Sequence, residues 1–193
     1  MDRPWQIAGK DMGGGVTSYR MLASSVQAQA SREQAEFRFA FGQFHLMAFG
    51  SARIVSIDRI VNPRLEQRYH ATRRRFLANN KPGSELWVFH GTGNKQNQAD
   101  IVVNGFKVGG QNGHPISNGA VFGQGVYTDL KARSAVSYGQ GAKSVILCKG
   151  LEGQKDRDDK GRNGGDSWRP SGRDWAVFRH SQQVLPMYVL HFQ

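Results

Sequence analysis

A histidine, two small residues and two tyrosines are the groups in this sequence whose order favours ligand chemistry. His90, Gly91 and Thr92 follow an apolar run that we expect to form a buried strand. Tyr127 follows a glycine-rich stretch, and Tyr138 lies on the helix expected after it. A histidine at a strand end can bond a ligand through a ring nitrogen, and glycine lets backbone approach closely. This arrangement is typical of a nucleotide site at the rim of a cleft.

Each of these residues also has a purely structural interpretation. Taken alone, His90 is a strand-end histidine whose hydrogen bonds are satisfied within the protein, and Tyr127 and Tyr138 are core aromatics. The occurrence of all three together with Gly91 and Thr92 favours the ligand site.

Alternation and apolar runs predict the strands that must position this site. Phe37, Phe39 and Phe41 alternate with Arg38 and Ala40, which predicts a half-buried strand. The other predicted strands are 54–60, 86–89, 143–151, 175–180 and 187–192.

The clearest helix signal follows the strand at 54–60. Asn62 is a suitable N-cap and Pro63 suits the first helical position, so we expect a helix that ends near 79–80. Its apolar side chains recur every three or four residues and form one stripe. The stripe consists of Leu65, Tyr69, Thr72 and Phe76.

Two further helices and two long loops are predicted between the remaining strands. One helix covers 97–104, and the other runs to residue 138 from a cap at Asp129. The glycine-rich segment 105–125 is expected to be a mobile lid beside the site, and 152–173 a charged connecting loop.

These elements indicate an α+β protein, with mostly antiparallel strands and a few flanking helices. We expect residues 36–193 to form one domain. Residues 1–35 are polar and are expected to be a loosely ordered lead-in or a short helix, with no function assigned.

The chain of 193 residues carries a formal net charge of +11, which favours polyanionic partners. Arg64, Arg68 and Arg75 recur at helical spacing. They predict either a basic binding face or an ordinary solvated helix face.

The cysteine content and the hydropathy of the chain indicate which kinds of site and which cellular location to expect. The single cysteine, Cys148, lies in an apolar run and is expected to be buried, which excludes disulfides and cysteine metal sites. The other histidines show no metal-ligand spacing, so we expect no metal. No run approaches the roughly 18 apolar residues of a membrane span, and the N-terminus lacks a signal-peptide core. We therefore expect an intracellular protein, in cytoplasm or nucleus, with no membrane partner. We also expect a monomer.

Four sequence blocks resemble, in order and spacing, the catalytic domain of the poly(ADP-ribose) polymerase family, the diphtheria-toxin-like ADP-ribosyltransferases. The blocks are 57–63, 87–92, 122–128 with 134–138, and 175–178 with 185–188. The resemblance covers roughly residues 37–192. It implies the ADP-ribosyltransferase fold, a split and mostly antiparallel sheet with flanking helices, and NAD as co-substrate.

The resemblance implies a role for each residue of the candidate site. His90 would bond the ribose in the adenosine half of NAD, and Gly91 would bind the nicotinamide carboxamide through its backbone. Thr92 would add a hydroxyl bond to the same amide, and Tyr127 and Tyr138 would lie on either side of the nicotinamide ring. The dinucleotide would thus be held while the bond from nicotinamide to ribose breaks through an oxocarbenium-like transition state.

The third catalytic position, after His90 and Tyr127, departs from the family pattern. Polymerising members carry a glutamate there. Alignment of the apolar run 175–178 places Asp174 at this position, whereas counting back from the following segment places Trp175 there. We favour Asp174, with a bulge absorbing the extra residue. Because aspartate is one methylene shorter than glutamate, we expect mono-ADP-ribosylation rather than chain elongation.

The expected function is therefore NAD-dependent ADP-ribosyl transfer to a protein or nucleic-acid acceptor, with release of nicotinamide. The alternative is a catalytically silent domain of the same fold that binds NAD, ADP-ribose or a partner protein. The related RNA 2′-phosphotransferases rank last, because their histidine and arginine set has no match here. The acceptor and the linkage chemistry stay open at this level.

Overall fold

The fold is built around one antiparallel sheet. The structure is a computed structural model that describes residues 5, 7–22, 31–47, 52–109 and 121–193. Within this part, nine strands follow the order β1-β2-β3-β9-β6-β4-β5-β8-β7. The strands are β1 Lys10–Gly13, β2 Val16–Leu22, β3 Ile54–Val61, β4 Glu85–Gly91, β5 Val126–Asp129, β6 Ser144–Leu151, β7 Ser167–Trp168, β8 Trp175–Phe178 and β9 Val184–Phe192. The helices are α1 Arg32–Met47, α2 Pro63–Ala78, α3 Lys95–Asn104, α4 Arg133–Gly139 and the short 3-10 turn η1 Ser181–Gln183.

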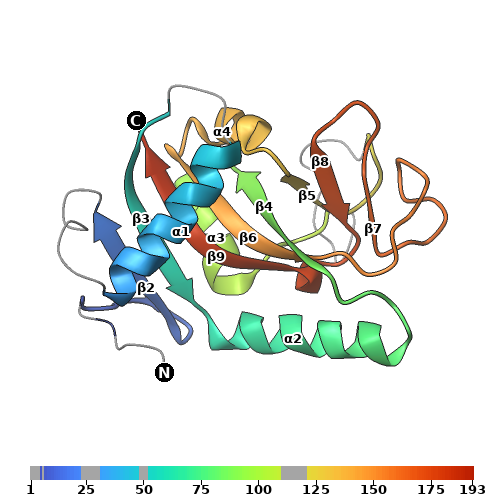
Figure 1. Cartoon of the computed structure of the whole chain (residues 1–193), viewed down its shortest axis with the longest axis horizontal. Coiled ribbons are helices and arrows are strands. Elements are labelled where there is room, and N and C mark those ends of the chain that lie inside the picture. Colours follow the sequence, from blue (N-terminus) through green and yellow to red (C-terminus); the bar gives the residue numbers. More distant parts are fainter. Residues whose placement is uncertain (1–4, 6, 23–30, 48–51, 110–120) are drawn as a thin grey trace.

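The sheet is split between β4 and β5. β4 pairs with β6 along its whole length, from Glu85 to Gly91, but its register with β5 is the single pair Phe89 and Asp129. Strands β5, β8 and β7 therefore form a smaller part of the sheet that diverges from the larger one, as Figure 1 shows at its right-hand side. The expected α+β class with a split, antiparallel sheet is confirmed.

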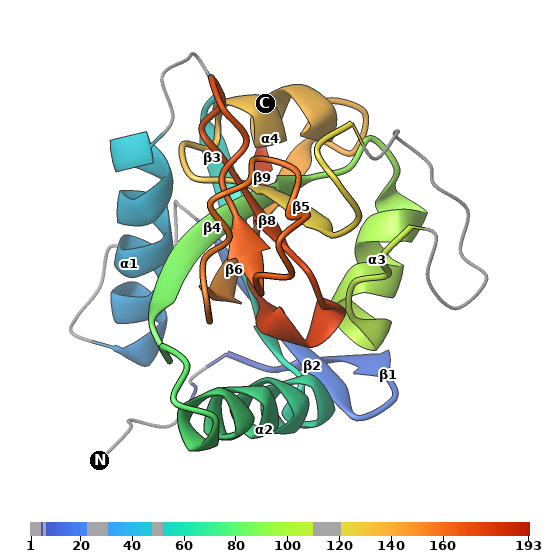
Figure 2. The ribbon, with the colours of Figure 1, turned by 90° about the vertical axis from the view of Figure 1, so that its right-hand side faces the viewer.

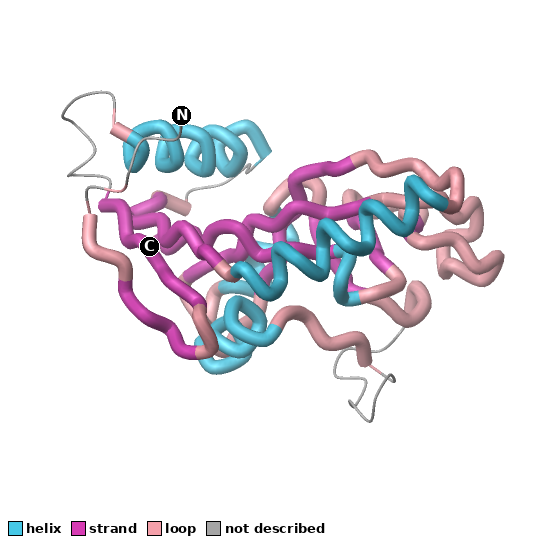
Figure 3. The backbone as a smooth tube through the Cα atoms, turned by 90° about the horizontal axis from the view of Figure 1, so that it is seen from below, coloured by secondary structure: helices cyan, strands magenta, loops and turns pink. Residues whose placement is uncertain are grey.

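Helices cover both faces of the sheet, with α1 and α3 on opposite sides (Figures 2 and 3). Helix α1 buries Phe37, Ala40 and Phe44 in the largest apolar cluster, together with Phe89 of β4 and Leu147 of β6. On the other face, α3 contributes to a smaller cluster. Helix α2 lies along the lower edge of the molecule in Figure 1 and packs on the ends of β6 and β9.

The prediction of a strand at 37–41 is wrong, because these residues belong to helix α1. The positions that face the core are Phe37, Ala40 and Phe44, which follow the period of a helix. Phe39 and Phe41 are exposed over 38% and 37% of their area. The alternation of aromatic residues therefore did not reflect alternation of burial, and Phe37 stacks on Phe41 one helical turn away.

The prediction of a loosely ordered lead-in or a short helix is also wrong for residues 10–22. Strands β1 and β2 form a hairpin at one edge of the sheet, and β2 pairs with β3 in antiparallel register. The last residue of β1, Gly13, and the turn residues Gly14 and Gly15 all have positive φ, which glycine adopts at little cost. Val16 and Met21 are buried, so the hairpin is fixed by core packing.

The signals for helix α2 are confirmed. Asn62 caps the helix, its side-chain oxygen accepting the backbone N–H of Leu65 at 3.1 Å, and Pro63 follows. The predicted stripe of Leu65, Tyr69, Thr72 and Phe76 is buried. The amide of Asn62 also donates to the carbonyls of Val102 and Val103, so one side chain joins the start of α2 to the end of α3.

The remaining predicted elements also lie close to their expected positions. Helix α3 ends at Gly105, whose φ is 87°, and the predicted strands correspond to β3, β4, β6, β8 and β9. The long loop at 152–173 contains the two-residue strand β7. Of the predicted lid, residues 110–120 lie outside the described part of the chain. No helix in the described part is long and apolar enough to cross a bilayer.

Replacing Asn62 by alanine should lower the free energy of unfolding by about 2 kcal/mol. The backbone N–H of Leu65 would lose its acceptor, and the carbonyls of Val102 and Val103 would lose their donor, all near a buried side chain. The matched control is Asn79→Ala at the exposed far end of α2, where the side-chain amide donates to the Arg75 carbonyl at 2.8 Å. Denaturant unfolding measures both variants. Equal losses would mean that the link from α2 to α3 does not stabilise the fold.

Candidate active site

His90 lies where β4 and β5 diverge, one residue beyond their single pair. Its Nδ1 atom is 2.9 Å from the carbonyl oxygen of Tyr127 on β5. Because a carbonyl can only accept, Nδ1 must carry the proton and donate it. The ring also meets Phe106 edge to face, with centroids 5.0 Å apart. The imidazole is therefore held from both sides of the split.

The electrostatics of His90 fix its charge as well as its tautomer. The surrounding protein partly shields the ring from water, which lowers the pKa of His90 below its ordinary value, and the bond to the Tyr127 carbonyl only partly offsets this effect. The imidazole is thus neutral at pH 7, with Nδ1 protonated. Its Nε2 atom is left as a hydrogen-bond acceptor, which suits a hydroxyl group.

Gly91 is required by the packing of α4. A Cβ atom on Gly91 would overlap the carbonyl oxygen of Ala135 and lie 2.7 Å from its carbonyl carbon. Helix α4 therefore lies directly on the backbone of β4 at this position. Sequence reasoning attributed this glycine to ligand contact, whereas the structure shows that helix packing alone already excludes a side chain.

Asp129 holds the start of α4 in place. Its buried carboxylate accepts the backbone N–H groups of Lys131, Ser134 and Ala135 at 3.1, 2.6 and 3.1 Å. The N-cap position itself is Ala132, with φ of 43° and no side-chain oxygen. Asp129 therefore caps the backbone N–H groups of this helix, as expected, although it lies three residues before the N-cap position.

The hydroxyl of Tyr127 is committed to the glycine-rich segment before β5. It donates to the carbonyl of Gly123 at 2.7 Å and accepts the backbone N–H of Phe122 at 3.1 Å. Burial raises the pKa of Tyr127, so the phenol stays protonated as a donor. The ring meets Trp175 edge to face at 6.1 Å. The hydroxyl of Tyr127 therefore holds the segment at 122–123 in place, and the half-buried ring is the part of the side chain that could contact a ligand.

Trp175 is the residue that the structure brings into this group. It pairs with Asp129 in the register of β5 and β8, so it shares a face of the sheet with Tyr127. Its indole N–H donates to the Ser134 hydroxyl on α4 at 3.1 Å, and its ring meets Phe122 at 5.8 Å. Sequence reasoning considered Trp175 only as the alternative to Asp174 and did not identify Ser134 or Phe122.

Asp174 lies at the surface. Its carboxylate is 3.1 Å from the ammonium group of Lys131, and the two side chains are 55% and 52% exposed. Its backbone carbonyl accepts the N–H of Leu130 at 2.7 Å, which extends the pairing of β5 and β8. In the described part of the chain, no hydrogen bond or ion pair joins Asp174 to His90 or Tyr127.

Tyr138 and Thr92 lie on neighbouring segments at the other end of α4. The carbonyl oxygen of Tyr138 lies 3.5 Å from where Gly93 would carry a Cβ atom, so the last turn of α4 runs beside residues 91–93. The Tyr138 side chain is 56% exposed, and Thr92 is partly exposed. The structure thus places the two residues on neighbouring segments, with the aromatic ring accessible.

The described residues contain no group of three or more histidine, cysteine or acidic side chains that could hold a metal ion. Cys148 is buried in β6, as expected, and burial raises the pKa of its thiol.

The family model described as the poly(ADP-ribose) polymerase catalytic domain matches residues 31–157, more than half of the chain. The matched segment runs from α1 through β6 and includes all the residues discussed above up to Tyr138. Asp174 and Trp175 lie beyond it. No curated protein sequence matches the chain.

Gly91→Ala should lower the free energy of unfolding by about 1–3 kcal/mol and displace α4, because the added methyl group overlaps the Ala135 carbonyl. Gly93→Ala is the matched control, since its nearest neighbour is at an ordinary contact distance of 3.5 Å. Thermal unfolding and the amide NMR shifts of α4 would report both effects. Similar behaviour of the two variants would contradict the close packing of α4 on Gly91.

Proposed function

Because this chain belongs to the poly(ADP-ribose) polymerase catalytic-domain family, we propose that it transfers single ADP-ribose units from NAD to a protein or nucleic-acid acceptor. In this reaction the bond from the ribose to nicotinamide breaks and a bond from the same ribose carbon to the acceptor forms. Nicotinamide leaves, and the acceptor loses a proton. The ribose becomes positively charged in the transition state, as in glycoside cleavage.

The observation that carries the proposal is the fixed, neutral imidazole of His90. Its Nδ1–H is bonded to the Tyr127 carbonyl at 2.9 Å, so Nε2 can accept a ribose hydroxyl. The ring is preorganised by β4, β5 and Phe106 before any ligand binds. A group that needs no rearrangement can orient a dinucleotide at little entropic cost.

The nicotinamide half would lie beside α4. The close approach of α4 to Gly91 sets the last turn of α4, which carries the exposed Tyr138, beside residues 91–93, and Tyr127 presents its ring from β5. Two aromatic faces with backbone polar groups and the Thr92 hydroxyl suit a planar carboxamide-bearing ring.

The surroundings of the third catalytic position support transfer of single units. Asp174 is shorter than the glutamate of polymerising members, and its carboxylate is ion-paired with Lys131 at 3.1 Å. Trp175, which has no carboxylate, is the neighbour of Tyr127. Elongation needs an acceptor ribose to be activated at this position, so the absence of a glutamate there favours a mono-transferase, and we propose Asp174 as its third catalytic residue.

The contact of Trp175, which has no carboxylate, with Tyr127 favours one alternative, a catalytically silent domain that binds NAD, ADP-ribose or a partner protein. If Trp175 holds the position of the missing glutamate, donor binding through His90 would persist without transfer. The two functions differ in whether nicotinamide is released.

His90→Ala should lower the rate of transfer from labelled NAD by about 10²- to 10³-fold, because a preorganised contact to the ribose is lost. The control is His70→Ala on the exposed face of α2. Nicotinamide release and label on protein and nucleic-acid acceptors are followed together. Wild-type rates in the His90 variant would refute the donor site, and NAD binding without release in the unmodified protein would establish the silent domain.

Asp174→Ala and Asp174→Glu test the third position. We expect the alanine variant to lose transfer, because no carboxylate is left at the ribose, and the glutamate variant to retain transfer and to add short chains. Gel separation of the labelled products distinguishes single units from chains. Equal activity in both variants and in the unmodified protein would assign the position to Trp175.

A further inference from the structure

One flank of helix α2 carries three arginines. Arg64, Arg68 and Arg75 share this flank, next to the buried stripe, and all three are exposed. At a rise of about 1.5 Å per residue they span about 16 Å along the helix axis. The chain as a whole carries a net charge of +11, so this flank concentrates part of a large positive excess.

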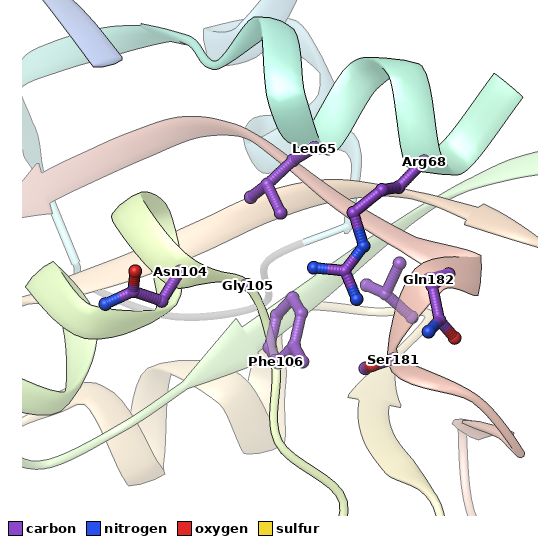
Figure 4. A pocket seen from close by; sticks show the side chains of 8 residues that line it. Leu65, Arg68, Asn104, Gly105, Phe106, Ser181 and Gln182 are labelled. Carbon is purple, nitrogen blue, oxygen red and sulfur yellow. The ribbon is translucent and has the colours of Figure 1, made fainter. Parts of the chain in front are cut away.

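Each arginine faces a different part of one surface. Arg64 donates to the Val103 carbonyl at 2.9 Å and to the Asn104 side chain at 3.3 Å. Arg68 points into a small pocket between α2, the end of α3 and η1, as Figure 4 shows. Helix α2, which carries Arg75, contacts η1. Burial lowers the pKa of His180 just before η1, and the charge of Arg75 lowers it further.

The acidic groups bordering this surface are already paired. Asp166 is bound by Lys81 at 2.9 Å, and Asp100 by Lys107 at 2.7 Å. Within the described part of the chain, the three arginines of the flank form no ion pair with a carboxylate. Their charge is therefore available to an external anion.

The groups between the arginines suit phosphate. The pocket under Arg68 is lined by the polar residues Asn104, Ser181 and Gln182 as well as apolar ones. Hydroxyl and amide groups of this kind commonly bind the phosphates of nucleic acids, and guanidinium groups match phosphate oxygens in pairs. The open volume of the pocket is about 10 Å³, enough for a water-sized group but not for a base. Phe106, its aromatic lining residue, is only 7% exposed.

We propose that the flank formed by Arg64, Arg68 and Arg75, with the adjoining polar surface of α3 and η1, binds the phosphate backbone of a nucleic-acid strand. Binding is independent of base sequence, because the surface offers charges and small polar groups but no accessible ring for stacking. Phe106 lines the pocket and also contacts His90, so a strand bound here would lie near the candidate active site. The idea that this strand is the acceptor of ADP-ribose rests on the proposed function. Binding itself requires no NAD.

The test is the salt dependence of binding to a fluorescent single-stranded oligonucleotide, with a duplex of the same sequence as a second probe. The variant Arg64→Gln, Arg68→Gln, Arg75→Gln should bind at least about tenfold more weakly at 50 mM salt. Its slope of log affinity against log salt should fall by about 2 for the single strand, at about 0.7 per lost phosphate contact. The control with the same charge change is Lys10→Gln, Lys95→Gln, Lys160→Gln, at exposed lysines on β1, α3 and the 152–173 loop. This control should keep the wild-type slope.

A second variant guards against a folding defect. Arg68→Gln with Arg75→Gln leaves the bond from Arg64 to α3 intact and should lower the slope by about 1.4. Equal weakening by the lysine control, unchanged binding in both arginine variants, or equally strong competition by polyglutamate of the same charge would each overturn the proposal. Nicotinamide release from NAD is measured in parallel as a separate readout. Oligonucleotide binding without nicotinamide release would contradict the proposed transferase function and leave the nucleic-acid surface standing. Nicotinamide release without oligonucleotide binding would contradict the nucleic-acid surface and leave the transferase standing.

Discussion

The pairing of Asp129 with Phe89 is the contact on which the arrangement of the site depends. It is the single register position between β4 and β5, and Asp129 also pairs with Trp175 of β8, so one residue joins the two parts of the sheet. Asp129 is 3% exposed. A buried carboxylate is costly unless it is hydrogen-bonded, and here backbone N–H groups of the α4 segment supply the donors. Strand β5 and helix α4 are thereby positioned as one unit against β4.

The split in the sheet creates the polar site. Beyond Phe89 the strands no longer pair, so the Tyr127 carbonyl accepts the His90 imidazole instead. On the other side of β4, α4 packs on Gly91 and brings its last turn, with Tyr138, alongside. His90, Gly91, Tyr127 and Tyr138 thus lie close to the point where the hydrogen bonding between β4 and β5 stops.

Charge is distributed differently around Tyr127 and along α2. The carboxylate of Asp129 is close to Trp175 in register, but its oxygens are occupied by α4. Asp174 is exposed and paired with Lys131. The ring of Tyr127 contacts the aromatic Trp175, over which the Arg173 guanidinium lies at 5.3 Å, and further positive charge lies on the flank of α2. An acceptor that brings its own negative charge would suit this distribution.

Local sequence signals determined those parts of the protein that depend on neighbouring residues. Asn62 and Pro63 specified the start of α2, its buried stripe followed from a period of three and four, and the run before His90 specified β4. The order of motifs also identified the family. The sequence did not reveal that Phe37 to Phe41 are helical, because only the sheet beneath α1 decides which of these rings are buried. Nor did it reveal the β1–β2 hairpin, whose strands are stabilised by pairing with the distant β3. The positions of Asp174 and Trp175 were decided by the register of β8 on β5. A shift of one residue exchanges the faces of a strand, and no local pattern fixes which residue then lies beside Tyr127.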